Sequence, residues 1–233
     1  MRETLKQSKF HRILFGEFHR NLKISDFDIG IFSTVTFLSL FGVVMIASVT
    51  IPLTDGSLSM TLNHIVKLIL AIFIGLLIFR VSLSTWKKID ISLIIFSFFL
   101  LTLVFFPLIG FEANGASRWI RILGFSFQPS ELMKFSLIIY ISSYCFRRMT
   151  EFKEKWLGFW KPVLVVISAI ALVLVEPDLG SSAVIFLISL TIMFIAGAPL
   201  KQMLIIFFMG LSVFISMILL VPWRMNRILS FVD

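Results

Sequence analysis

The chain has 233 residues, of which 58% are hydrophobic and 15% are charged. A soluble globular domain averages about 45–50% apolar and about 25% charged residues, so one soluble core could not bury this much apolar surface. The single cysteine, Cys145, excludes a disulfide scaffold and a cysteine-based zinc or iron–sulfur site. The hydrophobicity also excludes a disordered chain. The composition therefore predicts an all-α fold, a polytopic transmembrane helical bundle.

Seven apolar segments are candidates for membrane spans, because a helix needs about 20 apolar residues to cross the hydrocarbon core. They are expected at 29–51, 62–79, 91–111, 128–146, 162–175, 179–197 and 199–220. The fifth segment is short, which favours a start before Pro162. These segments predict three regions: a basic tail (1–28), a transmembrane domain with seven helices (29–220), and the start of a large outer loop (221–233).

The net charge of +8 is explained by topology. With the N-terminus inside, 15 of the 21 Lys and Arg residues fall on the inner side of the predicted spans. Four fall outside, and Lys67 and Lys134 lie within spans. Inner loops of membrane proteins are enriched in Lys and Arg, so the N-terminus is predicted in the cytoplasm and residue 233 outside. No nucleic-acid partner is expected.

The basic N-terminal tail carries an apolar residue at every fourth position from Phe10 to Leu22. This spacing predicts either a helix lying on the anionic inner leaflet or a loose basic tail, and the sequence leaves both open. The apolar run that follows is too long for the core of a cleavable signal peptide, so none is expected.

The informative residues are the charges near the outer ends of the spans, because charge within a membrane is costly and usually functional. The first group is the segment 112–121, which contains Arg118 and Trp119. A guanidinium suits phosphate or carboxylate. An interfacial Trp/Arg anchor explains the same residues equally well, so both interpretations stay open.

The second group begins the fourth span, at Gln128 and Pro129. Pro129 fits the first helical position, and Glu131 then lies where a carboxylate favours the helix dipole. Lys134 lies about 9 Å deeper than the start of the span, on the same face of the helix as Glu131. A charged pair at this depth favours a polar cavity over a purely structural pair.

The third group is Glu176-Pro-Asp-Leu-Gly180, between the fifth and sixth spans. Pro177 ends one helix and Asp178 is suited to cap the next, so a turn alone accounts for these residue types. Glu176 places a further carboxylate on the outer side. The sequence has no HExxH, P-loop or GxGxxG motif, so these residues alone indicate a charged outer site without naming a reaction.

Three motifs then occur in order between these spans: Gly115-Ala-Ser-Arg-Trp-Ile120, Gln128-Pro-Ser-Glu-Leu-Met-Lys134 and Glu176-Pro-Asp-Leu-Gly180. In this arrangement the chain resembles the SEDS family (shape, elongation, division and sporulation). The resemblance covers the first span to Asp233. The long basic tail, Met45-Ile-Ala-Ser48 and Gly158-Phe-Trp-Lys-Pro162 are closer to division-type members, with an elongation-type member as the alternative.

The resemblance implies a peptidoglycan glycosyltransferase of the bacterial inner membrane, acting at the division septum. Its substrate would be lipid II, an undecaprenyl-pyrophosphate-linked disaccharide-peptide that the enzyme polymerises into glycan strands. The implied partners are a class B penicillin-binding transpeptidase and other division proteins. No cofactor is evident, and a requirement for a divalent cation is left open.

The resemblance also implies that five residues line or brace a central cavity: Arg118, Gln128, Glu131, Lys134 and Asp178. Arg118 or Lys134 would hold the pyrophosphate, and a carboxylate would activate the attacking sugar hydroxyl. The family's proposed catalytic Asp is expected further along the outer loop than Asp233, so the catalytic residue is left unassigned.

Family members have about ten spans, which predicts that residues 1–233 are part of a longer protein and do not polymerise lipid II alone. Two other functions would use the same polar cavity. One is a lipid II flippase, and the other is a non-catalytic scaffold that recruits the transpeptidase.

Overall fold

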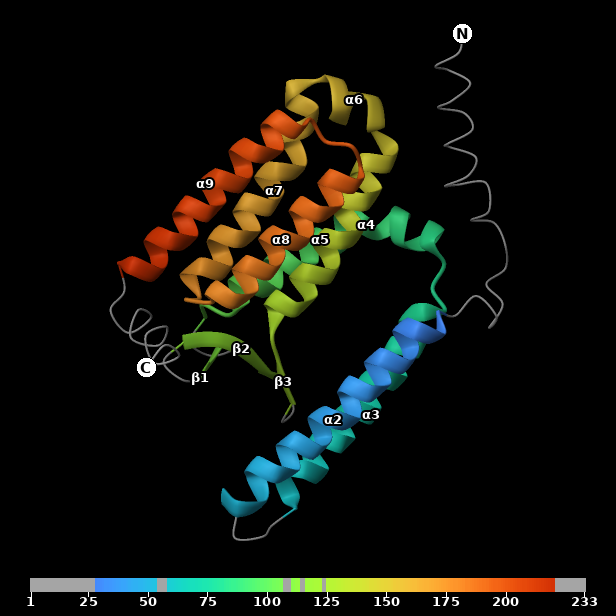
Figure 1. Ribbon diagram of the computed structural model, residues 1–233, viewed down its shortest axis with the longest axis vertical. Helices are drawn as coiled ribbons and strands as arrows, with labels where there is room; N and C mark the ends of the chain where they lie inside the picture. The colour runs from blue at the N-terminus through green and yellow to red at the C-terminus, as the bar shows by residue number, and fades with distance from the viewer. Residues whose placement is uncertain (1–27, 54–57, 107–109, 114–115, 123–124, 221–233) are drawn as a thin grey trace. The chain divides into compact units, whose positions relative to one another are not determined.

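The computed structural model describes residues 28–53, 58–106, 110–113, 116–122 and 125–220 (Figure 1). The predicted basic tail, except Asp28, and the predicted outer loop lie outside the described residues. Within the described ranges the chain forms helices and one small sheet. The helices are α2 Ile29–Leu53, α3 Ser59–Phe79, α4 Leu83–Leu103, α5 Pro129–Arg147, α6 Met149–Glu154, α7 Trp156–Val175, α8 Leu179–Ile195 and α9 Leu200–Leu219. The strands are β1 Gly110–Ala113, β2 Ala116–Ile122 and β3 Phe125–Phe127.

The chain divides into two compact units, Met1–Arg80 and Val81–Asp233. The first unit contains the hairpin of α2 and α3. Thr50 of α2 lies 3.2 Å from Thr61 of α3, hydroxyl to hydroxyl, and each helix is apolar over most of its length. Most of their described side chains are exposed, including many large apolar ones, which suits helices that lie in an apolar environment.

The second unit is a bundle in which α5 is central, because α4, α7 and α8 all pack against it. Its core is formed by Leu101 of α4, Met133 and Leu137 of α5, Val173 of α7 and Ile185 of α8, each at most 1% exposed. Figure 1 shows α5, α7, α8 and α9 side by side, with α6 at one end of the bundle and the sheet at the other. The positions of the charged motifs follow from this arrangement.

Four helices are long and apolar enough to cross a membrane: α2, α3, α7 and α9. The helix α8 is apolar but shorter. Two further helices carry charge, because α4 contains Lys87, Lys88 and Asp90, and α5 contains Glu131 and Lys134. The chain is therefore a multi-pass helical membrane protein, which confirms the predicted fold class.

The predicted third span, 91–111, is wrong in its position. Its helix begins at Leu83, where the Ser82 side chain caps it by accepting a hydrogen bond from the Thr85 amide at 3.3 Å, and it ends at Leu103. The prediction began after the charges, yet Asp90 lies inside the helix because Arg147 of α5 neutralises it, with Nη2 2.6 Å from Oδ2. The pairing partner lies far along the sequence, so hydropathy alone could not reveal it.

The end of the bundle opposite the sheet is closed by α6. Phe152 of α6 is fully buried, and the Tyr144 hydroxyl of α5 donates to the Gly158 carbonyl of α7 at 2.8 Å. A Cβ on Gly158 would lie 2.0 Å from the Glu151 carbonyl oxygen, so only glycine permits this close approach. The turn after α8 also needs glycine, because Gly197 has a φ of +84°.

The sheet between α4 and α5 was not predicted from the sequence. It is antiparallel in the order β1-β2-β3, with Glu112 opposite Ser117 and Arg121 opposite Ser126. The sequence contains a signal for it, since Asn114-Gly115 separates two segments with alternating residue types, a strong indicator of a β-hairpin. The sheet places Arg118 at the end of the bundle opposite α6.

Candidate functional site

Arg118 of β2 ties the sheet to the turn between α7 and α8. Its Nε donates to the Glu176 carbonyl at 3.0 Å, and its Nη2 donates to the Pro177 carbonyl at 2.6 Å. These carbonyls follow the end of α7, where backbone acceptors have no partner within the helix. Arg118 thus satisfies acceptors of the protein itself, and in this structure it braces the site.

Asp178 joins the same turn to the start of α5. Its Oδ2 accepts from Gln128 Nε2 at 3.0 Å and from the Ser181 hydroxyl at 2.8 Å, while Oδ1 accepts from the Ser181 amide at 2.9 Å. The last bond caps α8 in the way the sequence predicts. A buried carboxylate with several donors is well compensated for its loss of water. Asp178 is therefore also a brace.

Glu131 and Lys134 form a separate ion pair on α5. Lys134 Nζ lies 2.7 Å from Glu131 Oε1, and the side chains are 18% and 57% exposed for Lys134 and Glu131, respectively. The pair belongs to the first two turns of the helix that Pro129 begins. It is the part of the predicted site that an incoming molecule could reach, because Arg118 and Asp178 are bonded to other parts of the bundle.

Glu176 is the residue whose environment sequence reasoning did not foresee. It lies at the end of α7, is 1% exposed, and its two carboxyl oxygens have no hydrogen-bond partner among the described residues. Burial, reinforced by the nearby charge of Asp178 and opposed by that of Arg118, raises the pKa of Glu176 to about 8. The motif shows that a carboxylate is present, but no local pattern indicates that it would be buried.

The structure thus brings Arg118, Gln128 and Asp178 together with Glu176, and we call these four residues the outer junction. The pair Glu131–Lys134 lies next to the junction in sequence but shares none of the hydrogen bonds described for it. Ser130 and Ser181, whose hydroxyls are 3.4 Å apart and buried, further join α5 to α8. The five residues predicted for one cavity therefore divide into a brace and an exposed ion pair.

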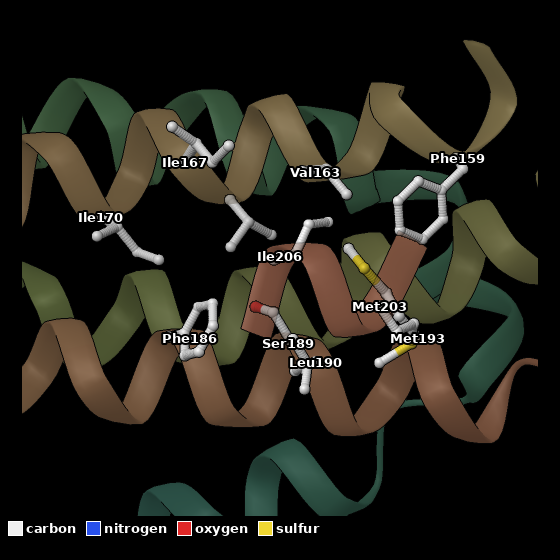
Figure 2. A pocket seen from close by; sticks show the side chains of 11 residues that line it. Phe159, Val163, Ile167, Ile170, Phe186, Ser189, Leu190, Met193, Met203 and Ile206 are labelled. Atoms are coloured by element: carbon white, nitrogen blue, oxygen red, sulfur yellow. The ribbon is translucent and has the colours of Figure 1, made fainter. Parts of the chain in front are cut away.

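An apolar cleft lies elsewhere, between α7, α8 and α9 (Figure 2). Val163 and Ile167 line it from α7, Phe186 and Met193 from α8, and Ile206 from α9. Ser189 supplies a hydroxyl that is buried without a partner in the described part of the chain. With almost no polar lining, this cleft does not suit a pyrophosphate or sugar, and we interpret it as a packing gap.

No three His, Cys, Asp or Glu side chains come together as a metal site within the described residues. The outer junction offers two carboxyl groups next to a guanidinium, which supplies positive charge of its own. The divalent cation that the sequence left open is therefore not assigned to a group of side chains.

A comparison with known protein families shows to which family the chain belongs. The model of the cell cycle protein family of FtsW, RodA and SpoVE matches residues 29–233. The chain belongs to this family. The membership predicted from the three motifs is confirmed, and the family match begins where α2 begins.

Curated relatives of this FtsW/RodA/SpoVE member include probable peptidoglycan glycosyltransferases named FtsW. The protein of Aliivibrio salmonicida is 37% identical over 200 residues, which cover 84% of this chain and 50% of the relative. That of Saccharophagus degradans is 37% identical over 210 residues, covering 88% and 54%. The chain spans about half the length of the curated relatives it matches.

Solved structures share the fold. The rod shape determining protein RodA of Thermus thermophilus aligns with a TM-score of 0.70 at 24% identity, over 83% of this chain and 60% of RodA. A chain of a peptidoglycan synthase complex, solved to explain how polymerization and crosslinking are coordinated, aligns with a TM-score of 0.69 at 24% identity, over 88% and 58%. At this identity the likeness shows that the helical fold is that of the family.

Proposed function

We propose that the chain belongs to the membrane part of a peptidoglycan glycosyltransferase that polymerises lipid II during bacterial cell division. The observation that carries the proposal is the family match over residues 29–233, together with relatives named as probable glycosyltransferases. The ion pair Glu131–Lys134 supplies the accessible charge that such a substrate needs. The alternatives of a flippase or a scaffold use the same residues but make no polymer.

Lys134 is the group that we assign to the pyrophosphate of lipid II. Its ammonium forms one described ion pair, and the partner in that pair, Glu131, has a side chain that is 57% exposed. Exposed ion pairs contribute about 0–1 kcal/mol, so exchanging Glu131 for a phosphate costs little. Arg118 is a poorer choice because Nε and Nη2 already hold the carbonyls of Glu176 and Pro177.

We further propose a partner and a place. A class B penicillin-binding transpeptidase would act beside the chain at the division septum, with other division proteins. The solved peptidoglycan synthase complex couples polymerization with crosslinking, and this supports a transpeptidase partner. The FtsW names of the curated relatives support the division site over the elongation machinery.

A chimera tests the proposal, because the chain spans about half of its relatives. The matching half of the Aliivibrio salmonicida relative is replaced by residues 29–233, and the purified chimera is incubated with labelled lipid II and its transpeptidase. We expect glycan polymer from the chimera and a loss of at least about tenfold for Lys134→Ala, the value of one charge-assisted hydrogen bond. The matched control is Lys67→Ala, because Lys67 is exposed on α3.

Two outcomes would contradict the proposal. If the folded chimera makes no polymer but moves lipid II across a liposome bilayer, the flippase is the better function. If the chimera neither makes polymer nor moves lipid II but still binds the transpeptidase, a scaffold is the better function. Parallel reactions with EDTA or Mg²⁺ test the divalent cation, and residues 1–233 alone are assayed beside the chimera.

A further inference from the structure

Two carboxyl groups in the outer junction, two residues apart, have opposite surroundings. Asp178 accepts three hydrogen bonds through its two oxygens. Glu176 is also buried, and its oxygens accept no hydrogen bond from the described residues. Donors stabilise an ionised carboxylate, and their absence in a buried place favours the neutral acid. The contrast between these neighbours therefore favours the neutral acid at Glu176.

The hydrogen-bond partners of Arg118 also favour a neutral Glu176. Its guanidinium donates to the backbone carbonyls of Glu176 and Pro177, and no ion pair joins it to the Glu176 side chain. Hydrogen bonds between a guanidinium and a carboxylate are roughly twice as strong as those between neutral groups. An ionised Glu176 beside Arg118 would therefore compete for the guanidinium, and the observed geometry is the one expected when Glu176 is uncharged.

We infer that Glu176 is a positioning residue: the proton on its side chain keeps Arg118 on the turn carbonyls and so holds β2 against the outer ends of α7 and α8. Loss of the proton would place a second negative charge next to Asp178. It would also draw Arg118 from the carbonyls to the Glu176 carboxylate. The sheet would then lose the two hydrogen bonds that hold β2 at the backbone of the turn.

The groups that govern this proton are few. Asp178 on the same turn raises the pKa of Glu176, and Arg118 of β2 lowers it, while burial is the largest influence. From α5, the neutral Gln128 reaches Asp178. Because the pKa of Glu176 is raised to about 8, the folded chain keeps a proton that the unfolded chain gives up near its ordinary pKa of 4.5. The contribution of Glu176 to the free energy of unfolding is then complete below pH 4.5, falls as the pH rises toward 8, and stays constant above pH 8.

Thermal unfolding of the purified chain in detergent, from about pH 5 to pH 9, tests the inference with Glu176→Gln. The variant carries a permanently neutral side chain of the same size. We expect the Tm of Glu176→Gln relative to wild type to rise steadily up to about pH 8 and then to stay constant. The matched control, Glu151→Gln, alters a carboxyl whose pKa the Arg148 hydrogen bond lowers, so its Tm difference should not rise in this window.

Two measurements do not depend on how well the variant folds. In wild type, infrared difference spectra should lose the band of a protonated carboxyl on titration through about pH 8. Amide hydrogen exchange of Ala116–Ile122, corrected for its intrinsic pH dependence, should rise at least about tenfold across the same step, because β2 loses the two hydrogen bonds from Arg118 to the turn carbonyls. Absence of the band overturns the inference, and so does unchanged exchange or a Tm difference independent of pH.

Discussion

Gln128 and Asp178 are 50 residues apart in the sequence, and the amide of one donates to the carboxylate of the other at 3.0 Å. This bond joins the first residue before α5 to the cap of α8. It makes two of the family motifs into one structural unit. The third motif enters through Arg118, which bonds the two residues preceding Asp178.

Replacing Asp178 tests whether this unit supports the fold. Asp178→Ala removes the α8 cap and leaves Gln128 and Ser181 without their acceptor. We expect a loss of about 2–4 kcal/mol in the free energy of unfolding, from a cap of about 0.5–2 kcal/mol and unsatisfied buried donors of about 1–3 kcal/mol. Asp178→Asn keeps one acceptor oxygen and should lose less. Equal loss by both variants, measured by denaturant unfolding in detergent, would show that the cap matters little.

The ion pair of Asp90 and Arg147 gives an asymmetric prediction. The Asp90 side chain is 2% exposed, whereas that of Arg147 is 39% exposed. Arg147→Met strands a buried negative charge and should cost about 3–5 kcal/mol. Asp90→Asn leaves a guanidinium that can reach water, so it should cost clearly less.

The double variant Asp90→Asn/Arg147→Met completes the cycle. It should be no less stable than Arg147→Met alone, because the stranded charge is gone. A double variant whose loss equals the sum of the two single losses would mean that the residues do not interact. Unfolding free energies of the four proteins in one detergent supply the comparison.

Gly158→Ala should destabilise the end of the bundle that α6 closes. The added Cβ would lie 2.0 Å from the Glu151 carbonyl oxygen, and backbone cannot move aside as a flexible side chain would. The matched control is Gly75→Ala in α3, where nothing lies within 4 Å of the new Cβ. Alanine is favoured over glycine in a helix by about 1 kcal/mol, so Gly75→Ala should be neutral or stabilising. A lower Tm for both would disprove the packing explanation.

The predicted topology is checked by labelling single cysteines in a chain with Cys145→Ala. Lys155→Cys lies beside α6 and Ser126→Cys lies in β3, at opposite ends of the bundle. The excess of Lys and Arg at the α6 end predicts that this end faces the cytoplasm. An impermeant thiol reagent on intact cells should therefore label Ser126→Cys and not Lys155→Cys. The reverse pattern would invert the orientation.

The sequence was most informative where a property is local. Apolar length located most helices, and Pro129 and Asp178 were correctly expected at helix starts. The pattern of residues also identified the family through three short motifs. These features depend on neighbours in the chain, so the amino-acid sequence contains what is needed to predict them.

The sequence was least informative where a contact joins distant residues. Asp90 of α4 is neutralised by an ion pair with Arg147 of α5. Arg118 of β2 donates a hydrogen bond to the turn after α7. Burial of Glu176 depends on the packing of several elements at once. The division of the five expected site residues into a brace and an exposed ion pair also arises only when β2, α5 and the α7–α8 turn meet.

The bonds of Arg118 have a mechanical consequence. By covalent connection the sheet belongs to α4 and α5, which precede and follow it along the chain. Arg118, however, also connects β2 to the carbonyls of Glu176 and Pro177 after α7, so a force on β2 acts on that turn. Asp178, the next residue, transmits the force to the first turn of α8 through its bond to the Ser181 amide. A molecule that binds the sheet and displaces it would therefore also displace α7 and α8, although neither helix is adjacent to the sheet along the chain.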